Sequence, residues 1–443
     1  MKEKQKKNQM ASDMGGEWVK RKIGSLGRVV TGKTPPTVDS SNFGGAYPFI
    51  TIPDLDGRVL IDRTERTLSD RGAEILRSCL LPPGSVMMSC IATVGKCGTT
   101  TRPSFTNQQI NSVIPNDEVD SRFLYYVFTQ LGHELESAGG GGSVYTNVSK
   151  NRFSDIEVVA PADIGEQRAI AHILGTLDDK IELNRRMSRT LEEMARAIFK
   201  SWFVDFDPVR AKCRGEPMCS PPIGQAHRPA PTDWHWPRHI LDLFPDRLVD
   251  SELGEIPEGW RVGAVGDLAE VSSGKRPNVR FPDASEQAAV PLWGGNGPIA
   301  FVPEVLVDEP ILLTGRVGTL GSVFRITTPC WPSDNTLVLR ANQQAAFEYL
   351  YLQLQQIDFT SLNRGSTQPL LTQTDLKALP LLLPQLAVLE RFSVLARTLY
   401  NRNDEAVAES RTLASIRDEL LPKLISGEIR VRDAERILRE RGL

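Results

Sequence analysis

Apolar residues recur at intervals close to seven along residues 166–203. One series is Ile170, Leu177, Leu191 and Ile198, and an intermediate series is Ile173, Ile181, Met187 and Met194. This spacing predicts a long helix whose apolar seam packs along another helix. No glycine or proline interrupts the pattern after Gly175, so the helix should extend for about 57 Å at about 1.5 Å per residue.

A second stretch of the same character, residues 389–425, offers a partner for that helix. The tetrapeptide Ser-Arg-Thr-Leu occurs in both stretches, at 188–191 and 410–413. The predicted seam consists of Ile170, Leu177, Asn184, Leu191, Ile198, Phe392, Leu399, Leu413 and Leu420. Asn184 either lies in the seam and fixes its register, at some cost in stability, or turns toward solvent; the sequence supports both readings equally.

The segments between the helices read as mixed domains. Short apolar runs bounded by turn residues, such as 47–52 and 85–91, predict strands, and residues 122–131 predict a helix. The second segment repeats the first: Trp18 and Gly32-Lys33 match Trp260 and Gly274-Lys275 at an offset of 242 residues. Further matches share an offset of 223 residues: Gly95 with Gly318, Gly142-Ser143 with Gly365-Ser366, and Pro161 with Pro384.

The chain is therefore predicted to be α+β and built twice, as globule, helix, globule, helix. If the two helices pack antiparallel, they hold the two domains apart in a pseudo-twofold arrangement, which suits a rod-like partner with two half-sites. The predicted segments are a disordered basic tail (1–15), a first mixed domain (16–161), a central helix (162–205), a connector (206–255), a second mixed domain (256–384) and a C-terminal helix with a tail (385–443).

Composition adds constraints rather than a function. The 443 residues suffice for two or three domains, six cysteines do not suggest a disulfide framework, and no apolar run predicts a membrane span. The basic N-terminus lacks the apolar core of a signal peptide, so we expect a cytoplasmic protein. A net charge of −3 argues against nucleic-acid binding, because nucleic-acid binders usually carry a basic excess.

The sequence contains no recognisable catalytic motif. It has no Walker loop, no Gly-x-Gly-x-x-Gly entering a helix and no Asx-Pro-Pro-aromatic tetrapeptide of an amino-methyltransferase. Five possible metal ligands lie in the connector, but their spacing fits none of the compact zinc frameworks: Cys213, Cys219, His227, His235 and His239. We therefore expect no metal, no bound cofactor and no catalytic residues in this chain.

The sequence gives stronger signs of binding than of catalysis, because both domains place side chains of the types that read base edges in matching loops. Taken singly, each such residue is more simply a solvated loop residue, and the recurrence in both copies is what favours binding. The first set is Lys33, Thr34, Gln108, Gln109, Ser143, Tyr145 and Asn147, and the second set is Lys275, Arg276, Asn335, Arg364, Ser366, Thr367 and Gln368. Lys96 and Arg316, beside the matched glycines, are candidates for phosphate contacts.

Three stretches resemble the specificity subunits of type I restriction–modification systems. They are AIFKSWFVDFDPVR at 197–210, SELGEIPEGW at 251–260 and RDELLPKLISGEI at 417–429. The helix start Glu166-Gln167-Arg168 is similar to the same family, and the resemblance covers nearly all of the chain after the tail. The Pro-rich connector around 213–239 and the basic tail depart from the usual pattern, which leaves the domain junctions open.

The resemblance implies a non-catalytic protein with two target recognition domains, each reading one half of a bipartite double-stranded DNA sequence. The two helices would form an antiparallel coiled coil that docks two methyltransferase subunits, which restriction (translocase) subunits then join. S-adenosylmethionine, ATP and Mg would bind to those partners. Partner subunits could also supply phosphate contacts and so ease the objection from charge. The alternative is a structural coiled-coil adaptor or a stand-alone DNA-binding regulator without a methyltransferase.

Overall fold

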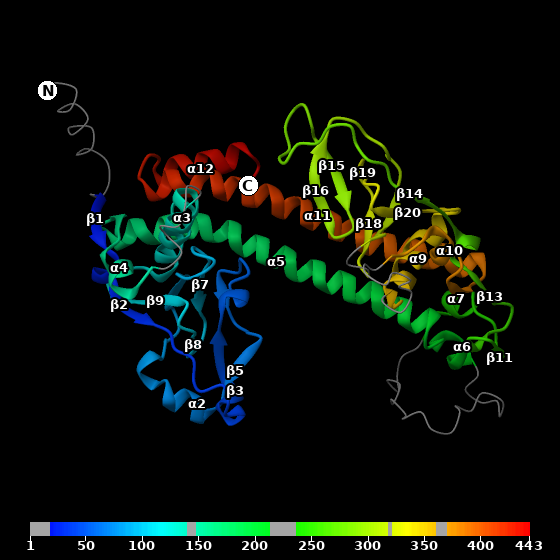
Figure 1. Ribbon diagram of the computed structural model, residues 1–443, viewed down its shortest axis with the longest axis horizontal. Coiled ribbons are helices and arrows are strands. Elements are labelled where there is room, and N and C mark those ends of the chain that lie inside the picture. Colours follow the sequence, from blue (N-terminus) through cyan, green and yellow to red (C-terminus); the bar gives the residue numbers. More distant parts are fainter. Residues whose placement is uncertain (1–17, 140–147, 213–235, 318–320, 360–369) are drawn as a thin grey trace. The chain divides into compact units, whose positions relative to one another are not determined.

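A computed structural model describes residues 18–139, 148–212, 236–317, 321–359 and 370–443 (Figure 1). They form two compact units, one of Met1–Arg186 with Ala406–Leu443 and the other of Met187–Glu405. Two helices of 40 residues each, α5 (Ile164–Phe203) and α11 (Leu386–Ile425), contribute one half to each unit. The predicted α+β architecture of globule, helix, globule, helix is confirmed.

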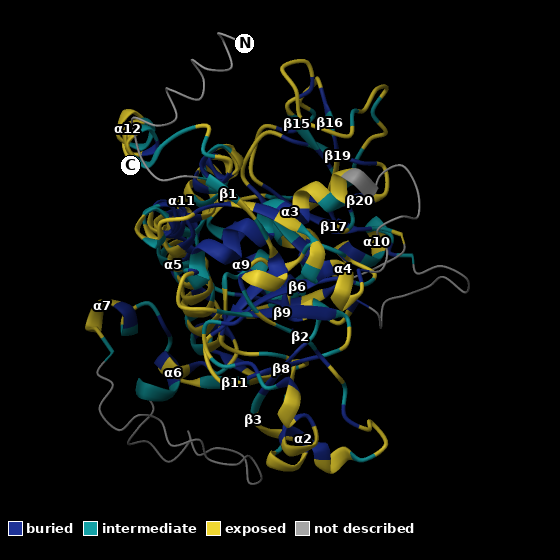
Figure 2. Cartoon of the chain, turned by 90° about the vertical axis from the view of Figure 1, so that its left-hand side faces the viewer, coloured by how far each residue is buried: buried dark blue, intermediate teal, exposed yellow. Residues whose placement is uncertain are grey.

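The first unit is built on a five-stranded sheet of order β2-β9-β6-β7-β4. Beside it lie a three-stranded sheet of order β5-β3-β8 and the antiparallel pair β1-β10. The strands are β1 Trp18–Lys22, β2 Gly27–Thr31, β3 Phe43–Ile50, β4 Leu60–Ile61, β5 Arg66–Leu68, β6 Val86–Ser89, β7 Cys97–Thr100, β8 Phe105–Thr106, β9 Ile110–Pro115 and β10 Glu157–Pro161. The helices are α2 Asp70–Ile75, α3 Ser121–Gly139 and α4 Lys150–Asp155. Figure 2 shows β6 and β9 as buried strands.

The second unit repeats this plan with a four-stranded sheet of order β14-β20-β17-β18, a small sheet β16-β15-β19 and the pair β13-β21. Its strands are β13 Arg261–Ala264, β14 Ala269–Ser273, β15 Val290–Gly294, β16 Gly297–Val302, β17 Ile311–Gly315, β18 Val323–Ile326, β19 Trp331–Pro332, β20 Thr336–Ala341 and β21 Pro380–Leu383. Its helices are α8 Val265–Leu268, α9 Phe347–Leu354 and α10 Gln373–Lys377. Among the described residues, no strand of this unit corresponds to β4.

One match of the sequence repeat is wrong. In the first unit Ser89 pairs with Ile110 and Met88 pairs with Cys97, as Gly315 pairs with Thr336 and Thr314 with Val323 in the second. By this register Gly95 of the first unit corresponds to Gly321 of the second, and not to Gly318. Gly95 and Gly321 both have a positive φ, +97° and +111°. Three residues are lost only after Asn116 and Asn342, so the offset of 223 holds at Pro161 and Pro384 and not in the hairpins, and the long helices repeat at an offset of 222.

The apolar seam of the two helices lies inside both units, and its contacts make the pair antiparallel. In the first unit Asn184 Nδ2 donates to Glu409 Oε2 at 2.8 Å, and in the second the rings of Phe199 and Phe392 lie 6.1 Å apart. Buried members of the predicted seam are Ile170, Leu177, Asn184, Phe392, Leu413 and Leu420, and Leu191, Ile198 and Leu399 are partly buried. Met194 was wrongly placed, because it is 47% exposed and Ala195 takes the buried position.

Helix α3 is held to both long helices by a buried polar cluster. Asp178 of α5 accepts hydrogen bonds from Tyr126 Oη of α3 and from Arg417 Nη1 of α11, both at 2.6 Å. The second unit has its own cluster, in which Arg325 of β18 contacts Glu348 of α9 at 3.8 Å and Asp404 of α11 at 2.8 Å. In each unit the mixed domain is thereby fixed to the long helices by charged groups as well as by the apolar core.

The connector and the C-terminus add short elements. Helices α6 (Asp207–Lys212) and α7 (Arg238–Leu241) and the hairpin of β11 (Leu248–Ser251) with β12 (Gly254–Pro257) lie in the second unit, and helix α12 (Val431–Glu440) lies in the first. In the part of the chain that is described, none of the helices has the length and apolar content that a bilayer crossing requires.

Candidate nucleic-acid interface

In the first unit, four strand ends meet at one end of the main sheet and carry the predicted polar residues. After β2, Gly32 N donates to Ile110 O and Lys33 N donates to Thr106 O at 2.9 Å. No residue other than glycine fits at position 32 with this backbone, because a Cβ would lie 2.2 Å from Asn107 O. The exposed Lys33 is therefore fixed beside the loop that opens β9.

Side chains of that loop hold one another in place. Thr34 Oγ1 donates to Gln108 Oε1 at 2.7 Å, and Asn107 Nδ2 donates to Gln109 Oε1 at 2.9 Å. Each glutamine keeps an amide NH2 group without a described partner, so a donor edge remains for a ligand. Lys96, which precedes β7, lies at the same end of the sheet because its backbone pairs with Ser89.

The second unit presents the same arrangement. Gly274 N donates to Thr336 O and Lys275 N donates to Pro332 O, which repeats the contacts of Gly32 and Lys33. Asn335 O accepts from Arg316 N at 2.9 Å, so the predicted residues Lys275, Asn335 and Arg316 lie at one sheet end. Arg276 follows Lys275 and is exposed.

Several buried polar atoms at this end of the second unit lack a hydrogen-bond partner among the described residues. They are Trp293 Nε1, Thr314 Oγ1, Arg316 Nε and Ser333 Oγ. Ser333 N donates to Trp293 O, and a Cβ on Gly295 would lie 2.8 Å from Gly315 Cα, so these atoms belong to one region. Unsatisfied buried polar groups are rare in folded proteins, which makes this edge suited to a polar ligand.

The two proposed phosphate contacts are not equivalent. Arg316 N bonds Asn335 O as Cys90 N bonds Gln109 O, so the residue that corresponds to Arg316 is Cys90 and not Lys96. Burial raises the pKa of the Cys90 thiol to about 11, which keeps it neutral near pH 7. The second unit thus has a cation at a position where the first unit has a neutral thiol.

Seven predicted contacts lie outside the described residues: Ser143, Tyr145, Asn147, Arg364, Ser366, Thr367 and Gln368. The residues that follow these two stretches of sequence are described, and they belong to the same sheet ends. Val148 N donates to Cys90 O, and Leu371 N donates to Arg316 O, both at 2.9 Å.

Where the chain is described, no group of three or more His, Cys, Asp or Glu residues could hold a metal ion. Of the connector ligands, Cys213, Cys219, His227 and His235 lie outside the described residues, and His239 Nε2 is 3.4 Å from Arg391 Nη2. Cys79, Cys90, Cys97 and Cys330 are buried free thiols.

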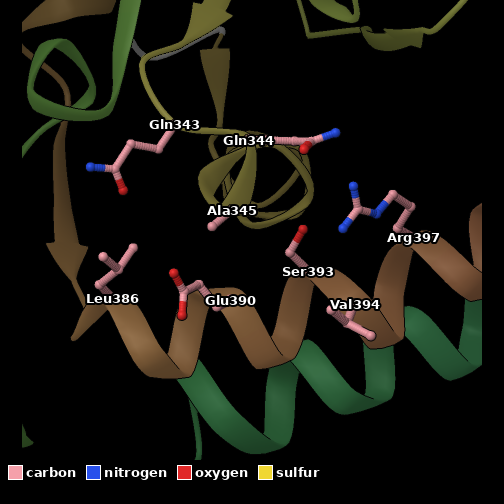
Figure 3. A pocket seen from close by; sticks show the side chains of 8 residues that line it. All are labelled: Gln343, Gln344, Ala345, Leu386, Glu390, Ser393, Val394 and Arg397. Carbon is pink, nitrogen blue, oxygen red and sulfur yellow. The ribbon is translucent and has the colours of Figure 1, made fainter.

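A pocket of about 460 Å³ lies in the second unit between α11 and the segment of residues 343–345, on the side of α11 away from α5 (Figure 3). It is lined by Gln343, Gln344 and Ala345, which precede α9, and by Leu386, Glu390, Ser393, Val394 and Arg397 of α11. At the corresponding place in the first unit, Arg122 fills the space: its Nη2 donates to Gly175 O at 2.9 Å, and it pairs with Asp179.

The chain is a duplicated α+β scaffold with polar loops at the same sheet end of both copies, an arrangement suited to a nucleic-acid recognition protein with two half-sites. The family model "Type I restriction modification DNA specificity domain" matches this chain twice, over residues 15–193 and 257–398. The chain belongs to this family, and its role is the non-catalytic recognition of a DNA target for a type I restriction–modification system.

Individual relatives agree with this assignment. The type I restriction enzyme MjaIX specificity subunit of Methanocaldococcus jannaschii is 26% identical over 94% of both chains. The HindI specificity subunit of Haemophilus influenzae is 36% identical over 39% of this chain and 38% of its own. The type I restriction–modification S subunit from M. genitalium shares the fold, with a TM-score of 0.58 and 16% identity over 93% of this chain and 97% of its own.

Proposed function

We propose that each unit reads one half of a bipartite DNA sequence, and that α5 and α11 set the distance between the halves. The observation that carries the proposal is the repeated set of backbone bonds that fixes Lys33 and Lys275 beside the polar loops before β9 and β20. Arginine, lysine, asparagine and glutamine are the side chains that read base edges in the major groove. Half-site 1 would contact Lys33, Thr34, Lys96, Gln108 and Gln109, and half-site 2 would contact Lys275, Arg276, Arg316 and Asn335, with the loops 143–147 and 364–368 completing them.

The chain also assembles with two methyltransferase subunits, which restriction subunits join. S-adenosylmethionine, ATP and Mg belong to those partners. The surface that favours protein docking is the side of α11 that lines the pocket of Figure 3, where Leu386 and Val394 are 48% and 47% exposed. Glu390 and Arg397 flank these apolar residues and have no ion-pair partner among the described residues, so a partner can complement both charges.

A domain exchange tests the bipartite reading. Residues 256–384 are replaced by the equivalent domain of a relative, a segment that includes both members of the β13–β21 pair. The methylated sequence of a host that expresses the chimera should change in one half only. A change in both halves, or in neither, contradicts the assignment of one half-site to each unit. Purification without any methyltransferase would instead favour a stand-alone regulator.

A further inference from the structure

The loop after Lys33 in the first unit is fixed at both ends. Lys33 N donates to Thr106 O, and the buried Asn42 donates through Nδ2 to Pro36 O at 3.0 Å. Six residues after Lys33, Asp39 accepts from Ser41 N and pairs with Arg71 at 2.8 Å. Between these attachments, Val38 is 99% exposed.

The loop after Lys275 in the second unit is fixed in a similar way. Trp331 Nε1 donates to Lys275 O at 2.7 Å, and six residues after Lys275 the backbone of Phe281 forms a bridge to Phe301. Between these attachments, Val279 is 53% exposed. The two loops differ in sequence, yet each presents an exposed valine within five residues of its lysine, between two hydrogen-bonded attachments.

A single exposed valine needs no explanation, since soluble proteins expose many apolar atoms. Here each of two corresponding loops carries one exposed valine, Val38 five residues after Lys33 and Val279 four residues after Lys275, and both loops start at the sheet end that carries the polar candidates. A base edge in the major groove offers one apolar feature, the 5-methyl group of thymine, and small apolar side chains contact it. An ordered loop presents such a side chain at low entropic cost.

Resting on the proposed function, we propose that Val38 and Val279 are specificity-determining residues, each of which contacts the methyl group of a thymine in its half-site. Val38 serves half-site 1 and Val279 serves half-site 2. Arg276 and Arg280, which are exposed on either side of Val279, hold the adjacent phosphates in the second half.

The test removes one methyl-bearing partner at a time. The target is first read from the methylated sequence in the host, and duplexes are made in which each thymine in turn is replaced by deoxyuridine, which lacks only the methyl group. Affinities are measured for the full chain, with whatever subunits co-purify with it, as wild type, Val38→Ala, Val38→Thr and Val279→Ala. Val159→Ala in β10 and Val305→Ala in the loop after β16 are the matched controls, because both valines are exposed and lie outside these loops and outside the proposed docking surface.

For the wild type, one deoxyuridine in each half should weaken binding about fourfold, the effect of one buried methyl group. Val38→Ala should bind more weakly and lose the response in half-site 1 only, and Val279→Ala should lose it in half-site 2 only. Val38→Thr, which keeps one methyl group, should retain part of the response that Val38→Ala loses, and the controls should behave like the wild type. A variant that keeps the full response at every thymine overturns the proposal, as does a half-site in which no replacement weakens the wild type. A wild-type chain that does not prefer its own target over a scrambled duplex contradicts the proposed function itself.

Discussion

Asp178 is the residue whose removal should most specifically loosen the first recognition domain from the coiled coil. Its side chain is 5% exposed and accepts from Tyr126 and Arg417. Burial and the neighbouring carboxylate raise the pKa of Tyr126, so its hydroxyl remains a donor and needs an acceptor. Asp178→Ala leaves that hydroxyl unpaired and deprives Arg417 of one of its two carboxylates.

The magnitude follows from what each partner retains. Breaking a buried ion pair costs about 3–5 kcal/mol, and a hydrogen bond to a charged group contributes about 1.5–3 kcal/mol. Because Arg417 is 24% exposed and keeps Asp418, the lower end applies, about 3 kcal/mol. Asp178→Asn preserves an acceptor for Tyr126 and should cost about half as much.

Hydrogen exchange measured by mass spectrometry resolves the two units in the full chain. In Asp178→Ala, amides of α3 (Ser121–Gly139) that exchange through opening of the unit should do so roughly a hundredfold faster, as about 3 kcal/mol predicts. Peptides of α9 (Phe347–Leu354) in the second unit serve as the internal control. Unchanged exchange in α3, or equal acceleration in α9, would refute the reasoning.

Two further predictions concern the spacer and pH. Inserting seven residues after Arg189 and seven after Arg402 lengthens the helix pair by about 10.5 Å, which should lengthen the unread spacer of the methylated sequence by about three base pairs. These sites avoid the α5 segment around Asp179, which pairs with Arg122. A spacer of unchanged length would show that the helices do not set the distance between the half-sites. Burial raises the pKa of the Glu348 carboxyl, so the folded chain binds a proton at this carboxyl more tightly than the unfolded chain does. The unfolding free energy of the wild type, relative to that of Glu348→Gln, should therefore fall as the pH rises from 4 to 7. Urea unfolding with Glu309→Gln as an exposed control tests the sign, and a rise with pH contradicts it.

The repeat and the two long helices could be predicted because they depend on periodicity alone. Apolar residues spaced by seven along a helix are buried against a partner helix, whichever part of the chain supplies that partner. The burial of Ile170 and Phe392 could therefore be predicted from the sequence alone. The sequence also suggested that Lys33 and Lys275 have matching surroundings, because the same Gly-Lys pair opens both loops.

Contacts that involve a third element could not be predicted. Asp178 is a charged residue beside the seam, and its burial depends on Tyr126 and Arg417, which lie far away in the sequence. The equivalence of Arg316 with Cys90 depends on hairpin register, which hydrogen bonds determine and glycine spacing does not. Which loop residues touch bases remains a prediction.

The joint between each domain and the coiled coil limits how the halves of this chain can be recombined. The first joint places an arginine on the domain, Arg122, over a glycine on the helix, Gly175, where a Cβ would lie 2.5 Å from the guanidinium carbon. The second joint reverses the sizes, with Ala345 on the domain and Arg397 on the helix. A first domain moved onto the second helix would bring two guanidinium groups together, and the reciprocal exchange would leave a void. A chimera that keeps each domain together with its own helix residues at the joint therefore avoids both defects.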